Sequence, residues 1–123
     1  MGRIRGDLGE RTIQFALRVL DLHDGLPNSP KGWVIGKQFI RSGTSIGSNI
    51  CEANHALTDA DFTHKCSLAR KEASETHYWL TLCKRGKLLS GGELDSMIDE
   101  ADQLVRILVT LVRTNQDRRA GES

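Results

Sequence analysis

The sequence has few aromatic residues, little proline and almost no net charge. Aromatic residues make up 5% of the 123 residues, so a core must be built from Leu, Ile, Val and Ala, which suits helix packing. The formal net charge of +1 gives no argument for nucleic-acid binding from bulk charge, so any such argument must rest on local clusters. There is no apolar run of 18 residues and no signal-peptide pattern. We therefore expect one globular cytoplasmic domain over residues 1–123, with no membrane partner.

Motifs that would support an enzyme or a metal protein are also lacking. The three cysteines have no CxxC spacing and are expected to be buried, reduced side chains (Cys51, Cys66 and Cys83). A di-iron bundle needs two Glu-x-x-His motifs, and only Glu52 to His55 supplies one. Neither a nucleophile elbow nor a phosphate loop occurs. The sequence therefore predicts no catalytic residue, no metal and no cofactor.

Turn and capping signals divide the chain into four helices. Both prolines fall in one break, where Ser29 followed by Pro30 predicts a helix start. Thr58 and the Ser90-to-Glu93 pair predict two further starts. The predicted helices span about 7–23, 30–54, 59–85 and 91–114, with a frayed tail over 115–123. Short connections then predict an all-α, antiparallel up-down-up-down four-helix bundle.

Apolar spacing predicts the buried face of each helix. In the first helix the expected core stripe is Ile13, Ala16, Leu17 and Leu20, with Phe15, Val19 and Leu22 beside it. In the third, steps of four and three residues form a heptad seam: Phe62, Cys66, Ala69, Ala73, Thr76, Leu80 and Cys83.

The second helix contains glycines in its interior. Gly36, Gly43 and Gly47 each disfavour a helix by about 1 kcal/mol relative to alanine. Either another backbone approaches closely at these positions, or the helix is broken there.

The fourth helix is apolar almost all round in its second half. Between Leu104 and Val112 only Arg106 and Thr110 are polar. One face of a bundle cannot cover so wide an apolar surface. We therefore expect this helix either to be central or to be buried a second time against another subunit.

Two groups of polar residues are candidate sites. The first lies beside the apolar seams of the second and third helices: Arg41, Ser45, Asn49, Glu52, Glu72 and Glu75. It is interpreted either as a contact network between helices or subunits, or as a lining for a ligand. The second is the set of arginines that the bundle topology places at one end: Arg3, Arg5, Arg11, Arg113, Arg118 and Arg119. These either bind nucleic-acid phosphates or are solvated beside neighbouring carboxylates.

Five stretches resemble a known bacterial family. They are GKQFIRSGTSIGSN at 36–49, EAN at 52–54, DFTHK at 61–65, ARKEASET at 69–76 and YWL at 78–80. Together they are similar to the 23S rRNA intervening-sequence proteins, also called S23-type four-helix bundle proteins. The resemblance implies a homopentameric ring. It also implies partners such as RNA, or a reverse-transcriptase-like protein as in a related retroelement branch.

From these patterns and this resemblance we expect a non-catalytic, self-assembling binding or scaffold protein that binds RNA or a nucleic-acid-handling partner. The alternative is a purely structural oligomeric bundle that binds a protein or a small molecule without nucleic acid.

Overall fold

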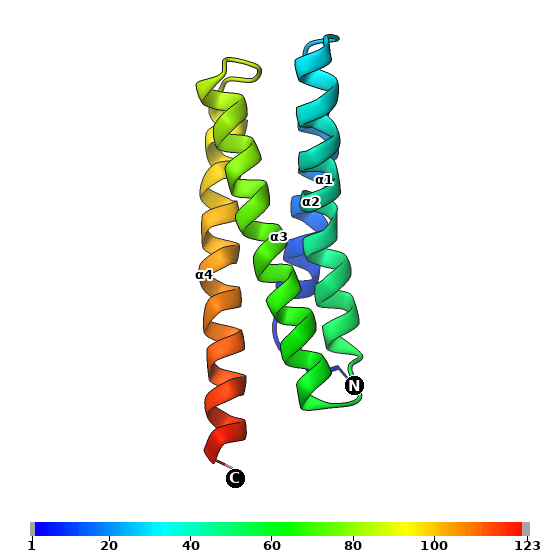
Figure 1. Cartoon of the computed structure of the whole chain (residues 1–123), viewed down its shortest axis with the longest axis vertical. Helices are drawn as coiled ribbons and strands as arrows, with labels where there is room; N and C mark the ends of the chain where they lie inside the picture. The colour runs from blue at the N-terminus through cyan, green and yellow to red at the C-terminus, as the bar shows by residue number, and fades with distance from the viewer. Residues whose placement is uncertain (1, 122–123) are drawn as a thin grey trace.

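Four helices make up nearly all of residues 2–121, the part of the chain that the computed structural model describes. They are α1 (Leu8–His23), α2 (Pro30–Asn54), α3 (Asp59–Arg85) and α4 (Gly92–Gly121). Short turns join them, and successive helices run antiparallel (Figure 1). The described residues contain no strand, which confirms the predicted all-α class. No helix in this part of the chain is long and apolar enough to span a membrane.

Side-chain caps fix the starts of α2 and α3. The extended residue Ser29 accepts a hydrogen bond from the Gly32 amide at 3.3 Å, and Pro30 takes the first helical position. The Thr58 hydroxyl accepts from the Asp61 amide at 3.1 Å. At the end of α3 the left-handed residue is Lys87, with φ 60°, and not its glycine neighbour.

The glycines of α2 allow α1 to approach closely. A Cβ added to Gly43 would lie 2.8 Å from Val19 Cγ2, and one added to Gly47 would lie 3.2 Å from Thr12 Oγ1. Because α2 is continuous from Pro30 to Asn54, the alternative of a broken helix is wrong. The glycines lower the helix propensity of α2 without breaking it, and they permit the close contact with α1.

The seam predicted for α3 is confirmed, whereas the face predicted for α1 is wrong. All seven seam residues of α3 are buried. In α1 the buried residues are Leu8, Thr12, Phe15 and Val19. The expected stripe points outward, with Ile13 53%, Leu17 49% and Leu20 44% exposed. Both stripes have helical spacing, and the fit of Val19 against Gly43 selects the other one.

The helix α4 differs from expectation in length and in surroundings. It continues to Gly121 instead of ending near Thr114. The buried Asn115 docks this last part, because its amide donates to Thr63 Oγ1 on α3. None of the strongly exposed large apolar side chains of the described chain belongs to α4. The strongly exposed apolar side chains therefore lie on α1, α2, α3 and the turn between α2 and α3. In the second half of α4 several apolar side chains are only half-buried, so its burial against a second subunit stays a prediction: Val105, Ile107, Val109, Leu111 and Val112.

Ion pairs connect α4 to α1. Arg11 binds both carboxylate oxygens of Glu100 at 2.6 Å, and Arg18 Nε lies 2.7 Å from Glu93 Oε1. Backbone contact between these two helices is sparse compared with the other neighbouring pairs. The helix α4 is consequently peripheral and packs mainly on α3, so the expectation of a central α4 is wrong.

Candidate nucleic-acid interface

An N-terminal strap, residues 2–7, crosses the adjacent ends of α2 and α3. The Arg3 amide donates to the Asn54 carbonyl at 3.1 Å, and the Ile4 amide donates to Asn54 Oδ1 at 2.7 Å. The Arg3 side chain donates to the Ala56 carbonyl at 2.8 Å. These bonds cap the end of α2 and hold the strap over the turn that leads into α3.

One carboxylate ties the strap to the end of α4. Asp59 Oδ1 lies 2.6 Å from Arg3 Nη1 and 3.1 Å from Arg118 Nη2. The hydrogen bond from Arg3, followed by that from Arg118, lowers the pKa of Asp59 below its usual value. The Arg3 guanidinium also lies 5.7 Å from the centre of the Phe62 ring. Two of the predicted arginines therefore also hold the fold together.

Two adjoining grooves open beside the strap and share Arg3 and Arg5. One, of about 450 Å³, is lined by Gly2, Arg3, Arg5, Phe62, Leu111, Thr114, Asn115 and Arg118. The other, of about 490 Å³, is lined by Arg3, Ile4, Arg5, Asp7, Leu8, Arg11, Ile107, Thr110, Leu111 and Thr114. Arg5 is exposed and makes no hydrogen bond or ion pair within residues 2–121. A ligand can therefore reach Arg5 without displacing a partner among these residues.

The predicted arginine cluster is only partly assembled. Arg3, Arg5 and Arg118 line one groove. Arg11 is held by Glu100, whose hydrogen bond is the main cause of the raised pKa of Arg11. Arg113 lines a separate groove of about 260 Å³ with Arg70. The remaining member, Arg119, is exposed near the end of α4. The sequence did not identify Asp59 as an anchor, because nothing local distinguishes it from an ordinary residue at a helix start.

The predicted polar network between α2 and α3 is smaller than expected. Arg41 Nη2 lies 2.7 Å from Glu75 Oε2, and Arg41 Nη1 lies 3.2 Å from Glu72 Oε2. The hydrogen bond to Glu75, followed by the charge of Glu72, raises the pKa of Arg41. The other three members do not join it. The Ser45 hydroxyl donates to the Arg41 carbonyl and the Asn49 amide to the Ser45 carbonyl, while Glu52 pairs with Lys65 at 3.4 Å.

Sequence reasoning missed a buried polar contact beside this network. The Ser42 and Thr76 hydroxyls lie 2.9 Å apart between α2 and α3, and both residues are fully buried. Thr76 belongs to the predicted apolar seam, and the apolar periodicity of α2 assigns no role to Ser42. Each hydroxyl also lies within hydrogen-bond distance of a carbonyl of its own helix, Glu72 for Thr76 at 2.7 Å and Phe39 for Ser42 at 3.5 Å, so both buried polar groups have partners.

The expectation for the cysteines holds at two positions of three. Cys66 and Cys83 are buried, and burial raises the pKa of each thiol to about 11. Cys51 is exposed, so its predicted burial is wrong. Its position on α2 flanks the glycine side and lines a groove with Ile13 of α1. Among the described residues, no group of three or more His, Cys, Asp or Glu side chains could hold a metal ion.

The pKa of Asp59 predicts acid-sensitive docking of the strap. Because the folded-state pKa lies below the unfolded value of about 4, the ion pairs stabilise the strap fully above that pH and are lost as the pH falls through the lowered pKa. We expect the Arg3 and Ile4 amides to lose protection in that range, measured by hydrogen exchange corrected for intrinsic rates. Asp59→Asn should weaken protection at neutral pH and remove the acid transition. An acid transition that persists unchanged in Asp59→Asn would contradict this role.

The fold and this interface define a class: a small helical protein with an arginine-lined groove at one end. The family model for 23S rRNA-intervening sequence proteins matches residues 7–110, and the chain belongs to that family. A solved structure from Bacteroides thetaiotaomicron VPI-5482, described as a protein with unknown function from the S23 ribosomal protein family, is similar. It shares 38% identity over 85% of this chain and 96% of that chain, with a TM-score of 0.78. No curated protein sequence matches the chain significantly.

Proposed function

We propose that this protein is a non-catalytic, self-assembling scaffold of the cytoplasm that binds RNA backbone phosphates at the strap end. The observation that carries the proposal is the position of Arg5, which lies beside Arg3 and Arg118 in one groove, is exposed, and makes no hydrogen bond or ion pair with the residues that the structure describes. Arg3 and Arg118 share the Asp59 carboxylate, and Arg5 adds a third guanidinium to a groove whose described lining holds no carboxylate. Arginines placed in this way suit phosphate contacts that carry little sequence information.

Self-assembly would give this modest site its affinity. The protein's net charge of +1 does not favour tight binding by one copy. In a ring of five copies, the number that family resemblance implies, each subunit would present the same groove to one RNA. Binding at the second and later grooves would then be intramolecular, which raises overall affinity without new contacts.

Salt-dependent titration tests the proposal. The purified protein is titrated with a structured RNA and with duplex DNA at about 50 and 200 mM salt. We expect binding that weakens steeply with salt. Arg5→Ala should reduce the slope of log K against log salt by about 0.7 to 0.9 for each engaged subunit, because one phosphate contact is lost in each.

Arg5 allows a cleaner test than Arg118, because removing Arg118 also disturbs Asp59. Arg85→Ala is a matched control, since Arg85 is also exposed and without a partner in the described chain but lies at the far end of α3. An equal effect of both variants would indicate diffuse attraction and not a site. An absence of binding at the lower salt would overturn the proposal and favour a protein partner, such as a reverse-transcriptase-like protein, or the purely structural alternative.

A further inference from the structure

The outer face of α1 is apolar and acidic. Its apolar residues, Ile13, Leu17 and Leu20, are spaced by four and three residues and are each about half exposed. Glu10 and Asp21 continue the same side of the helix at its two ends. The two arginines of α1 turn toward α4, where Glu100 and Glu93 bind them. We call these five residues (Glu10, Ile13, Leu17, Leu20 and Asp21) the α1 face.

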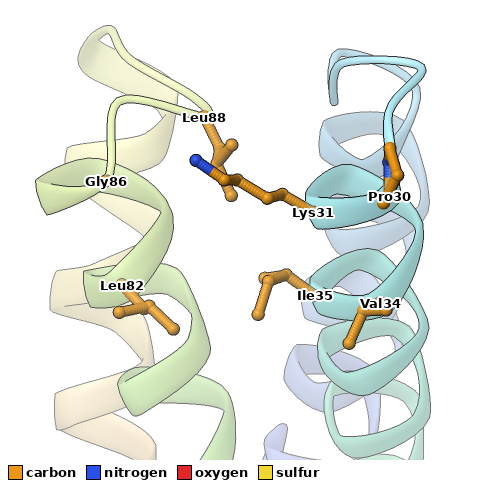
Figure 2. A pocket seen from close by; sticks show the side chains of 7 residues that line it. All are labelled: Pro30, Lys31, Val34, Ile35, Leu82, Gly86 and Leu88. Atoms are coloured by element: carbon orange, nitrogen blue, oxygen red, sulfur yellow. The ribbon is translucent and has the colours of Figure 1, made fainter.

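A groove between the start of α2 and the end of α3 has the opposite charge. It has a volume of about 510 Å³ and is lined by Pro30, Lys31, Val34, Ile35, Leu82, Gly86 and Leu88. Figure 2 shows the Lys31 side chain reaching across the opening toward Leu88. Lys31 makes no ion pair or hydrogen bond within residues 2–121, and no carboxylate is among the described lining residues. Val34 is 61% exposed. We call this the α2–α3 groove.

We propose that the α1 face of one copy docks into the α2–α3 groove of a second copy. This inference rests on the self-association in the proposed function and specifies which surfaces meet. Apolar side chains meet on both sides, and the carboxylates of Glu10 and Asp21 approach a groove whose lining charge is Lys31. At 1.5 Å per residue, the stripe from Ile13 to Leu20 is about 10 Å long and the α2 segment along the groove, Pro30 to Ile35, is about 8 Å long.

The charges favour this head-to-tail contact over a symmetric one. If two α1 faces met, the acidic residues Glu10 and Asp21 of one copy would lie near those of the other. If two grooves met, two Lys31 side chains would lie near each other, and like charges repel in both cases. The two surfaces share no residue, and α1 packs on the glycine side of α2, away from α3. Each copy can therefore use both surfaces at once. Heterologous contacts of this kind close into a ring or continue as a filament.

A mixing experiment tests the pairing. Leu17→Arg alters the α1 face and leaves the groove intact, whereas Val34→Glu alters the groove and leaves the α1 face intact. Both residues are well exposed, so each variant should keep wild-type circular dichroism. By light scattering the wild type should be a multimer and each variant alone a monomer. Mixed in equal amounts at about 100 μM, since a single interface lacks the gain from ring closure, the two variants should form a one-to-one dimer.

The control is Leu57→Arg, which makes the same change at a 93% exposed leucine in the turn between α2 and α3. It should leave the wild-type mass unchanged. A multimeric wild type whose mass survives both test variants would overturn the inference but not self-association. Two monomeric variants that stay monomeric when mixed would likewise exclude the head-to-tail pairing. A monomeric wild type would overturn self-association itself.

Discussion

Replacing Gly43 by leucine should lower the free energy of unfolding by about 3 kcal/mol, because the new side chain must occupy the space of Val19. A Cβ at this position already lies 2.8 Å and 3.0 Å from the two methyl groups of Val19. Val19 is fully buried and stiff at χ1, so it cannot turn away. The helices α1 and α2 must separate to admit the larger residue. Urea unfolding followed by circular dichroism measures the loss as a lower midpoint.

Smaller substitutions separate steric clash from helix propensity. Gly9→Ala adds the same methyl group where nothing lies within 4 Å, and it should stabilise the protein by up to about 1 kcal/mol. Gly43→Ala should destabilise it despite the same gain in propensity. The double variant Gly43→Ala with Val19→Ala should lose less unfolding free energy than the sum of the two single losses, because the smaller residue 19 removes part of the steric clash. A Gly43→Leu variant with the wild-type midpoint would show that α1 does not pack as closely as described.

Local signals predicted the helices themselves. Pro30, Ser29 and Thr58 act through bonds within a few residues, so the starts of α2 and α3 could be placed from the sequence. The end of α4 could not, because its last turns depend on Asn115 and Arg118 meeting Thr63 and Asp59 of α3. Such contacts join residues more than fifty positions apart, and no local pattern reports them.

The candidate interface was predictable in outline for a similar reason. An antiparallel four-helix order brings the two chain ends together, so Arg3, Arg5 and Arg118 could be expected at one end. Which of these arginines form ion pairs with carboxylates could not be predicted. Whether an arginine is held by a carboxylate, as Arg11 is by Glu100, depends on the rotation of both helices. Arg5 can be singled out only from the structure.

The sequence does not determine how α1 is rotated about its own axis, that is, which of its two apolar stripes faces the core. Two variants distinguish these orientations. Phe15→Ala should cost about 3 to 5 kcal/mol of unfolding free energy, because Phe15 is 1% exposed and its removal leaves a cavity in the core. Leu17→Ala, on the other stripe of the same helix, should cost less than about 1 kcal/mol in the monomer, since Leu17 is 49% exposed. Urea midpoints at low protein concentration compare the two. A larger loss of unfolding free energy for Leu17→Ala than for Phe15→Ala would mean that the stripe with Leu17 is the buried face of α1.

The concentration dependence of the same two variants links folding to assembly. A contact between copies stabilises the folded state more as protein concentration rises, through mass action. If the α1 face docks on a second copy, Leu17→Ala should lose stability relative to wild type progressively as concentration increases. Phe15→Ala should show a large loss that is present at every concentration, because Phe15 lies within one chain's core. A constant difference between Leu17→Ala and wild type would mean that the exposed stripe of α1 faces solvent in the assembly.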